Sequence, residues 1–420
     1  MSEGKLIDTR PGSTGSLDVE SVRAQFPALE HGTAFFDGPG GSQTPEAVTD
    51  AIGDALRAGL SNRDRGTHSG RRADDIVLAA RSAIADLVGA DSDAVVFGRS
   101  MTALTFDLAR TLTRRWGPGD NVVVTSLDHD ANIRPWVIAA ESVGAQARFA
   151  HFDIETTELP ATALAEVISE RTRVVALTGA SNILGTRPDV AAITELAHQV
   201  GALVFLDAVH LVPHARVDLN ELGVDLLACS PYKFFGPHVG VLTGAPEVLE
   251  SLSPDKLAPS PDRVPERFEL GTLPYEMLAG VSAAVDFLAS LAPDVPPSST
   301  RVAALDAAYQ GIHRHEMELL ARLEDGLAQI PGVIRYSRAA DRTPTSFFTV
   351  DGLMSAQVSQ RCAVANINAP SNHFYALEAS RRLGLGTDGA IRAGLAPYNT
   401  AAEVDALLEV VRSAAEYPHS

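Results

Sequence analysis

The chain has 420 residues, of which 45% are hydrophobic and 21% are charged, and its formal net charge is −19. This length and composition predict an ordinary globular protein with a large core and two domains in one compact unit. The negative charge and the scattered basic residues argue against a surface for nucleic acid or for anionic membranes.

The cysteines and the N-terminus exclude further classes of protein. Two cysteines, Cys229 and Cys362, are too few for a disulfide framework and lack the spacing of a CxxC metal site, so we expect no metal. The first residues, MSEGKLIDTRPGSTGS, have no apolar core, which predicts a polar arm and no secretory signal. No run of 18 uninterrupted apolar residues occurs. We therefore expect a cytoplasmic, reduced protein without nucleic-acid or membrane partners.

Helical periodicity comes first along the chain. Thr44 and Pro45 predict the N-cap and first position of a helix with Val48, Ile52 and Leu56 on one face. A second helix is predicted by the apolar spacing over residues 74–88.

Four short runs are apolar throughout, which is typical of strands buried on both faces of a sheet. They lie at residues 95–97, 122–124, 174–177 and 203–206. Their alternation with helices predicts a doubly wound, mainly parallel α/β sheet, whose functional residues lie at the carboxyl ends of the strands.

A change of composition marks the later part of the chain. A proline-rich loop at Ser253–Arg267 precedes an apolar helix at Tyr275–Leu291. The Pro/Ser-rich break at Pro293–Thr300 predicts the boundary to a smaller C-terminal domain. Thr400 and Glu403 predict a capping box at the start of its last helix.

The stretch SPYKFFGPHV contains the first candidate catalytic residue, Lys233. A free lysine is mostly protonated at neutral pH, but partial burial among Tyr232, Phe234 and Phe235 would disfavour the ammonium form. The alternative interpretation is a solvated loop lysine.

Asp207 ends the apolar run LVFLD, upstream of this lysine. It is either a helix N-cap at a βα turn or a functional acid. A strand-end aspartate and a later lysine are what an enzyme that uses pyridoxal 5'-phosphate (PLP) needs. The lysine forms the Schiff base and the acid pairs with the pyridinium nitrogen.

Three further segments contain candidate cofactor-binding or substrate-binding residues. In GRSMTALTFDLA, the N–H groups around Met101 and Thr102 would face an anion at a helix N-terminus, or Ser100 or Thr102 simply caps the helix. His129, in DHDANIRPW, either lies on a cofactor ring, shuttles protons or is exposed. Arg392 either grips a substrate carboxylate or makes a surface ion pair.

Five segments, in this order, resemble the fold-type I PLP enzymes of class V, the aminotransferase and cysteine desulfurase group. They are FFDGPGG, DAVHLVPH, SPYKFFGPH, RFELGT and AIRAGLAPYNT, and the resemblance covers nearly the whole chain. It implies an α/β large domain with a mainly parallel seven-stranded sheet flanked by helices, and a smaller α+β C-terminal domain. The implied divisions are residues 1–34 (an arm and a segment packing with the small domain), 35–292 and 293–420.

The resemblance also implies how the cofactor is held. Lys233 is the Schiff-base lysine and moves the α-proton, Asp207 pairs with the pyridinium, and His129 stacks on the ring. Asn182 and His210 lie near the phenolic oxygen; the family often has Gln at the second position, and the departure is expected to tune the Schiff base. The phosphate is assigned to Met101, Thr102 and Ser230, with Thr272 from a neighbouring subunit.

The same resemblance implies a homodimer with shared active sites and an amino acid as substrate. Arg392 binds the substrate α-carboxylate. The rest of the predicted substrate site is Gly40, Arg65, His68, Asn372, His373 and Tyr375, with Arg65 and His68 lining the partner's site. Desulfurases often have His where Tyr232 stands, so a phosphate contact is not carried over to Tyr232.

One departure from the desulfurases concerns the reaction. They carry a nucleophilic cysteine on a loop before the carboxylate-binding arginine, and here NINAPSNHFYALEASRRLGLGTDGAIR contains none. Cys362 lies in a predicted helix that leads into a strand, and Cys229 in or beside the strand before Lys233. Because a persulfide relay needs a thiolate that reaches the substrate sulfur, we expect no persulfide-forming desulfurase.

Three functions follow as hypotheses. The first is a C–S lyase that performs β-elimination on a cysteine or an S-substituted cysteine conjugate. The second is oxidative decarboxylation–deamination, transamination or epimerisation of an amino acid conjugate in specialised biosynthesis. The third is a catalytically silent PLP-fold partner or regulator, against which the joint presence of Lys233, Asp207, His129 and Arg392 speaks.

Overall fold

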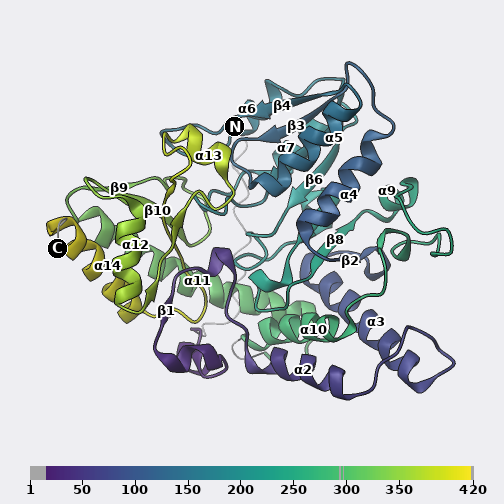
Figure 1. Cartoon of the computed structure of the whole chain (residues 1–420), viewed down its shortest axis with the longest axis horizontal. Helices are drawn as coiled ribbons and strands as arrows, with labels where there is room; N and C mark the ends of the chain where they lie inside the picture. Colours follow the sequence, from purple (N-terminus) through teal and green to yellow (C-terminus); the bar gives the residue numbers. More distant parts are fainter. Residues whose placement is uncertain (1–15, 293–294, 297, 418–420) are drawn as a thin grey trace.

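The computed structural model describes residues 16–292, 295–296 and 298–417. The predicted N-terminal arm lies almost wholly outside these residues, as does part of the predicted break at Pro293–Thr300. Figure 1 shows a large sheet with helices on both sides and a smaller sheet beside it. Within the described residues, no helix is long and apolar enough to cross a membrane.

The large sheet has seven strands in the order β2-β8-β7-β6-β5-β3-β4. Their bounds are β2 (Val96–Gly98), β3 (Asn121–Thr125), β4 (Gln146–Ala150), β5 (Thr172–Thr178), β6 (Leu203–Asp207), β7 (Leu226–Cys229) and β8 (Gly240–Gly244). β8 runs antiparallel to both of its neighbours, and the remaining pairs are parallel. The predicted mainly parallel α/β sheet is therefore confirmed.

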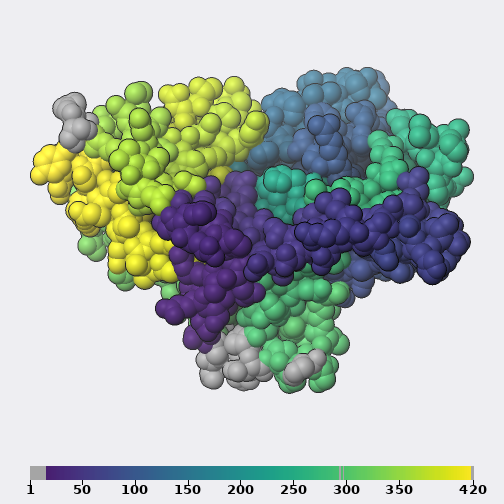
Figure 2. Space-filling view, turned by 60° about the horizontal axis from the view of Figure 1, so that its bottom comes forward, coloured from purple at the N-terminus to yellow at the C-terminus, as the bar shows by residue number. Residues whose placement is uncertain are grey.

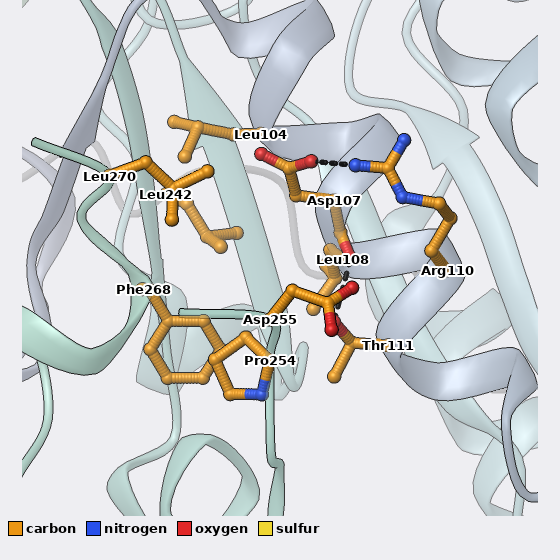
Figure 3. Close-up of a pocket in the computed structure, with 10 residues that line it drawn as sticks. All are labelled: Leu104, Asp107, Leu108, Arg110, Thr111, Leu242, Pro254, Asp255, Phe268 and Leu270. Carbon is orange, nitrogen blue, oxygen red and sulfur yellow. Dashed lines mark hydrogen bonds and ion pairs between the residues drawn. The ribbon is translucent and has the colours of Figure 1, made fainter. Parts of the chain in front are cut away.

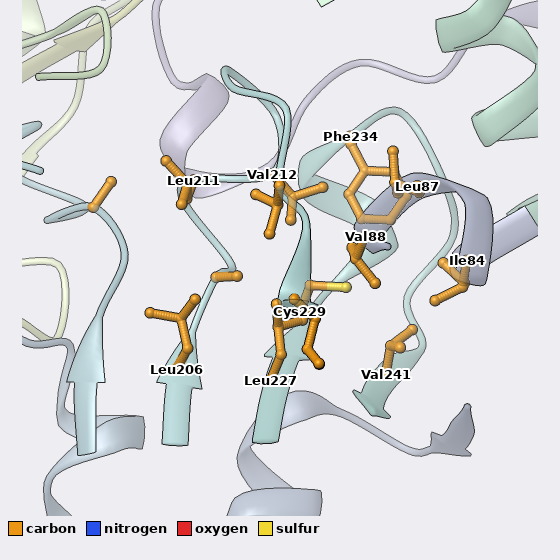
Figure 4. Close-up of a cluster of buried hydrophobic side chains, with 14 of the residues drawn as sticks. Ile84, Leu87, Val88, Leu206, Leu211, Val212, Leu227, Cys229, Phe234 and Val241 are labelled. Atoms are coloured by element: carbon orange, nitrogen blue, oxygen red, sulfur yellow. The ribbon is translucent and has the colours of Figure 1, made fainter. Parts of the chain in front are cut away.

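Alternate residues of the apolar strands enter two separate cores, one on each face of the sheet. Val123 and Leu206 pack in the core that contains residues of α3, whereas Val122 and Phe205 pack in the core that contains residues of α4. Figure 4 shows Leu206, Leu227 and Val241 of the strands together with Ile84, Leu87 and Val88 of α3. An uninterrupted apolar run suits such a strand because both of its faces leave water.

Helices cover the two faces of this sheet. Their bounds are α3 (His68–Val88), α4 (Met101–Thr113), α5 (Arg134–Ser142), α6 (Ala161–Ala165), α7 (Val190–Gln199), α8 (Leu219–Leu222), α9 (Pro246–Ser251) and α10 (Tyr275–Ser290). Two N-terminal helices, α1 (Val19–Arg23) and α2 (Glu46–Arg57), precede them.

The start of α2 corrects one prediction. Pro45, not Thr44, is the N-cap, because Pro45 has extended backbone angles and no side chain caps the first turn. Val48 on the predicted face is buried, but Leu56 is 63% exposed. The apolar stripe is therefore only partly covered within one chain.

The small sheet is antiparallel, in the order β12-β13-β10-β9. Its strands are β9 (Val333–Arg335), β10 (Thr345–Val350), β12 (Ser371–Asn372) and β13 (Ala390–Gly394), and its helices are α12 (Ser355–Val364), α13 (Leu377–Arg382) and α14 (Ala401–Glu416). The predicted capping box of Thr400 and Glu403 at the start of α14 is confirmed.

The N-terminal segment joins this part of the molecule. β1 (Ala34–Phe35) pairs in parallel with β11 (Ile367–Asn368). Figure 2 shows the N-terminal residues in purple packed beside the C-terminal residues in yellow. The division at residues 34 and 292 remains a proposal.

The long helix α11 (Arg301–Ala328) runs through two cores. Leu305 and Ile312 of its first half pack in the core of the large sheet, whereas Leu319 and Leu323 of its second half pack in the core of the small sheet. Between them Glu316 is buried and paired with His214 Nδ1 at 3.0 Å. One helix therefore connects both sheets.

Candidate active site

The polar residues of the candidate site follow the carboxyl ends of adjacent strands. Asn182 lies shortly after β5, Asp207 is the last residue of β6, and Lys233 follows β7. β5, β6 and β7 are neighbours and parallel, so these ends meet at one edge of the sheet.

Lys233 ends the short 3₁₀ helix η5 (Pro231–Lys233). Its Nζ lies 4.8 Å from the centre of the Tyr232 ring and donates a hydrogen bond to the Pro39 carbonyl oxygen. Burial, with the nearby Arg392 charge, lowers the pKa of Lys233 to about 7, although Asp207 and Asp37 act in the opposite direction. A large fraction of the amine is thus unprotonated and nucleophilic at neutral pH.

Asp207 is buried and its Oδ1 accepts a hydrogen bond from Val209 N at 2.9 Å. Burial raises the pKa of this carboxyl to about 6, against the Val209 hydrogen bond and the charge of Lys233. The next helix, α8, begins only at Leu219, so the alternative of a helix N-cap does not hold. A cationic N–H placed beside Asp207 would favour the ionised carboxylate.

His129 carries a neutral imidazole. Its Nδ1 accepts a hydrogen bond from Ala131 N at 3.0 Å, which places the ring proton on Nε2. Burial, together with the charges of Lys233 and Arg392, lowers the pKa of His129 to about 4. Its ring centre lies 5.5 Å from that of Tyr375, at an interplanar angle of 33°.

The N-terminus of α4 offers donors for an anion. Ser100 is the N-cap, and its hydroxyl accepts from Ala103 N at 3.1 Å, so Ser100 rather than Thr102 fills the capping role. The N–H groups of Met101 and Thr102 belong to the first turn and have no acceptor within the helix. Such donors suit a phosphate.

A glycine keeps β8 close to this helix end. At Gly240 a Cβ would overlap the backbone of Ser100 and Met101. Ser230, buried between β7 and Lys233, supplies a hydroxyl near the same strand ends.

Asn182 and His210 each keep one buried polar atom without a hydrogen-bond partner among the described residues: Oδ1 of Asn182 and Nδ1 of His210. His210 Nε2 lies 3.1 Å from the hydroxyls of both Thr343 and Thr345. Burial lowers the pKa of His210 well below its usual value, so the ring is neutral. Buried polar atoms without partners fit a hydrogen-bonding ligand.

Arg392, on β13, is only 2% exposed. Its NH1 donates to the Asn182 carbonyl oxygen at 3.0 Å, and its Nε has no partner among the described residues. Burial lowers the pKa of Arg392 to about 9, so the guanidinium remains charged at neutral pH. A buried cation with an open donor suits a carboxylate ligand and excludes the alternative of a surface ion pair.

The segment from Asn372 to Tyr375 faces the large-sheet residues. Tyr375 O accepts from Asp130 N at 2.7 Å, and Tyr375 N donates to His373 Nδ1 at 3.1 Å. The Asn372 side chain accepts from His373 N at 2.7 Å, whereas the Tyr375 side chain is 70% exposed. The structure therefore brings this predicted segment beside His129 through Tyr375.

Three predicted residues make their contacts elsewhere on the surface of the chain. Arg65 pairs with Asp74 at 2.9 Å, His68 Nδ1 lies 3.0 Å from Arg71, and Thr272 is exposed. Arg65 lines a hollow of about 470 Å³ together with other ion-paired residues. Their roles at a neighbouring subunit's site stay predictions.

A second, smaller hollow lies beside α4 and contains none of the predicted site residues. Figure 3 shows its apolar side with Leu104, Leu242 and Phe268, and the ion pair between Asp107 and Arg110 on its rim. Its volume is about 50 Å³, which leaves room for little more than water.

Sequence reasoning missed three residues. Asp128 is fully buried and accepts from Asn132 Nδ2 at 2.7 Å; burial raises its pKa well above the usual value. It lies shortly after β3 rather than at its last residue, so the signal that identified Asp207 is weaker here. Asp37, inside FFDGPGG, has an unpartnered Oδ1 among the described residues, and burial raises its pKa. The third is Phe374, which no sequence pattern marks.

These groups fit PLP. A lysine amine, a strand-end acid and a neutral imidazole lie together, and a helix N-terminus offers donors for the phosphate. The unpartnered atoms of Asn182 and His210 would offer polar contacts to its ring substituents.

Comparisons with known proteins agree with this fit. The sequence profile described as "Aminotransferase class-V" matches residues 34–407. The chain is 35% identical to "Uncharacterized protein MT3887" of Mycobacterium tuberculosis, over 95% of this chain and 99% of that protein. It is 32% identical to "Aminotransferase-like protein FGM3" of Gibberella zeae, over 94% and 98%. The crystal structure of the cysteine desulfurase CsdA from Escherichia coli superposes with a TM-score of 0.84 and 28% identity, covering 96% of this chain and 99% of that one.

Proposed function

The chain belongs to the class-V aminotransferase family of PLP-dependent enzymes. Within this family we propose that it is a C–S lyase. The proposed substrate is cysteine or an S-substituted cysteine conjugate, and the proposed reaction is β-elimination without a protein persulfide.

The burial of both cysteines is the observation that supports this proposal. Cys229 and Cys362 are both 0% exposed. Figure 4 shows Cys229 among Leu227, Val241 and other apolar side chains. Burial raises the pKa of Cys362 to about 11 and that of Cys229 further. A thiol that neither ionises nor reaches the substrate cannot accept its sulfur.

The proposed reaction begins at the substrate α-carbon. Arg392 holds the α-carboxylate, and the amine of Lys233 removes the α-proton. A base with a pKa of about 7 can both accept and return a proton near neutral pH. When bound, PLP supplies the sink for the electron pair left at the α-carbon. Asp207 would hold the proton on the ring nitrogen of the bound cofactor, and His129 would lie against the ring.

The C–S bond then breaks. The α-carbon electron pair forms the bond to the β-carbon, and the sulfur leaves with the electron pair of the broken bond and takes up a proton. Lys233, protonated in the first step, can supply that proton. After hydrolysis the remaining three-carbon fragment gives pyruvate and ammonia, so no external oxidant or reductant is needed.

Product analysis tests this proposal. The PLP-loaded enzyme is mixed with L-cysteine and a panel of S-alkyl cysteines, and pyruvate and free thiol are measured. Equal amounts of both products, absent with Lys233→Ala, are expected. Mass spectrometry should find no persulfide on either cysteine. Formation of alanine with a protein persulfide, or no product across the panel, would contradict it.

Transamination is the second candidate, because one relative is named aminotransferase-like. It would convert the bound cofactor into pyridoxamine 5'-phosphate, which chromatography of the released cofactor detects. Oxygen uptake with aldehyde formation would instead identify the oxidative route.

We also propose a homodimer in the cytoplasm. The exposure of Arg65, His68 and Thr272, and of apolar Leu56 and Leu270, supports a covering subunit. The two free thiols support a reducing compartment. Mixing inactive Lys233→Ala with inactive Arg65→Ala should restore activity if the sites are shared, and no restoration would contradict sharing.

A further inference from the structure

Phe374 lies on the segment where a desulfurase-like enzyme would place its cysteine. We propose that Phe374 is a positioning residue for substrate binding, whose ring fixes the Arg392 guanidinium so that one particular edge meets the substrate α-carboxylate. This inference rests on the proposed function in one respect, namely that Arg392 binds that carboxylate.

Three residues form a closed set of contacts. The Arg392 guanidinium carbon lies 3.7 Å from the centre of the Phe374 ring. Arg392 NH1 donates to Asn182 O at 3.0 Å, and Asn182 Nδ2 donates to Phe374 O at 2.9 Å. Each residue thus touches the other two. Since Asn182 follows β5, the set joins the small sheet to the edge of the large sheet.

These contacts leave one edge of the buried guanidinium without a hydrogen-bond partner among the described residues. The Phe374 ring contacts the flat face, and Asn182 O takes NH1. Nε has no partner among the described residues, and NH2 lies 3.1 Å from the place that a Cβ would take at Gly40. Nε and NH2 form the edge that can hold a carboxylate side-on through two hydrogen bonds. Glycine at position 40 leaves room beside that edge.

The backbone at Phe374 is held in a costly conformation. Phe374 has φ of 49° and Tyr375 has φ of 59°, both in the left-handed region that aromatic residues rarely adopt. Hydrogen bonds to Phe374 O and Tyr375 O hold it, and at Gly389 a Cβ would overlap the Asn372 backbone. Such a conformation persists only where the surroundings enforce it, and it is common at ligand-binding sites.

An aromatic ring at position 374 holds Arg392 specifically because Arg392 is positively charged. The face of an aromatic ring attracts a cation, and this attraction is stronger when the pair is out of water. Within the described residues, Arg392 has no carboxylate partner at ion-pair distance. An aliphatic side chain at position 374 could fill the space but would not attract the charge.

A binding experiment isolates this role. L-alanine and L-alaninamide share an amino group, but only L-alanine has a carboxylate. Their binding to the PLP-loaded enzyme is measured by the change in the visible absorbance of the cofactor. The wild type should prefer L-alanine. Phe374→Gly and Phe374→Leu should each lose about tenfold of that preference, whereas Phe374→Tyr should stay within about twofold.

The variants separate positioning from folding. Phe374→Gly removes the ring and also suits the left-handed backbone, so loss of the preference in a stably folded Phe374→Gly enzyme cannot come from misfolding. Phe152→Leu is the matched control, since Phe152 is a buried aromatic with Arg382 over its ring at 5.5 Å. It should lower the melting temperature and leave the preference unchanged.

The contrary outcomes distinguish failure of the Phe374 role from failure of the Arg392 role. If Arg392→Gln loses the preference but Phe374→Gly keeps it, Phe374 has no positioning role and the proposed function stands. If the wild type binds both compounds equally, or binds neither, then the role of Arg392 fails and the role of Phe374 fails with it.

Discussion

The candidate site has two walls that are built differently. The large-sheet wall, formed by Asn182, Asp207 and Lys233, stands at the ends of adjacent parallel strands whose residues are buried on both faces. The small-sheet wall, formed by Arg392 and residues 372–375, depends on a short segment with two successive left-handed aromatic residues.

We expect the two walls to serve different functions, one in cofactor binding and the other in substrate binding. The large-sheet wall is fixed by two hydrophobic cores, so it can present the same groups to a cofactor at every turnover. In the small-sheet wall, Arg392 is held by β13, but residues 372–375 are held mainly by a few hydrogen bonds and ring contacts. Small changes in that segment should therefore alter substrate binding before they alter cofactor binding.

The largest effect is expected on the large-sheet wall. Lys233→Ala should lower turnover by more than about a thousandfold, because it removes the proposed base and the amine proposed to anchor the cofactor. The visible absorbance of the bound cofactor should vanish with it. Unchanged turnover would remove Lys233 from the site.

A pair of glycine substitutions compares the walls directly. Gly240→Ala and Gly389→Ala each place a Cβ against backbone, at Ser100 and Asn372 respectively, and Gly389 also has φ of 66°. Each should cost about 2–4 kcal/mol of stability. At equal loss of melting temperature, Gly240→Ala should release the cofactor more readily, whereas Gly389→Ala should mainly raise KM. The reverse pattern would contradict the assignment of tasks.

A pH experiment tests whether the walls are electrostatically linked. In the proposed site, the cofactor-free protein captures PLP through the neutral amine of Lys233, whose pKa is lowered to about 7 by burial and by Arg392. The capture rate should therefore rise with pH, with a midpoint near 7. Arg392→Gln removes a nearby positive charge and should move the midpoint upward, as stopped-flow absorbance from pH 5.5 to 9 would reveal. An unmoved midpoint would show that the walls act independently.

The smallest effect is expected from the cysteines, which belong to neither wall. Cys229→Ala with Cys362→Ala should lower stability by about 1–2 kcal/mol for each lost side chain in a core, and change turnover by less than about twofold. Thermal unfolding and pyruvate release measure the two effects. Loss of all turnover in a folded double variant would favour a sulfur-accepting cysteine.

Sequence reasoning succeeded where burial alone determines structure. The all-apolar runs predicted β3, β5 and β6 because a strand covered on both faces tolerates only such residues, and Asp207 stood out as the polar residue that ends one of them. Asp128 does not end its strand but follows Thr125, Ser126 and Leu127, so the same pattern does not mark it. Leu56 was misjudged because periodicity predicts an apolar face without showing what covers it.

Phe374 could not be predicted for a different reason. Its contact with Arg392 joins two residues on separate parts of the small-sheet region. Its left-handed backbone occurs at an aromatic residue rather than at the glycine or asparagine that usually indicates such a conformation. The expected roles of Arg65, His68 and Thr272 depend on contacts with a second subunit, which residue patterns within one chain do not specify.

The helix α11 has a mechanical consequence. Because its two halves are anchored in different cores, with Glu316 paired to His214 between them, swinging one sheet away from the other would have to bend the helix or unpack an anchored end. Entry of the substrate should therefore require displacement of a few loop residues rather than a hinge rotation of one sheet against the other.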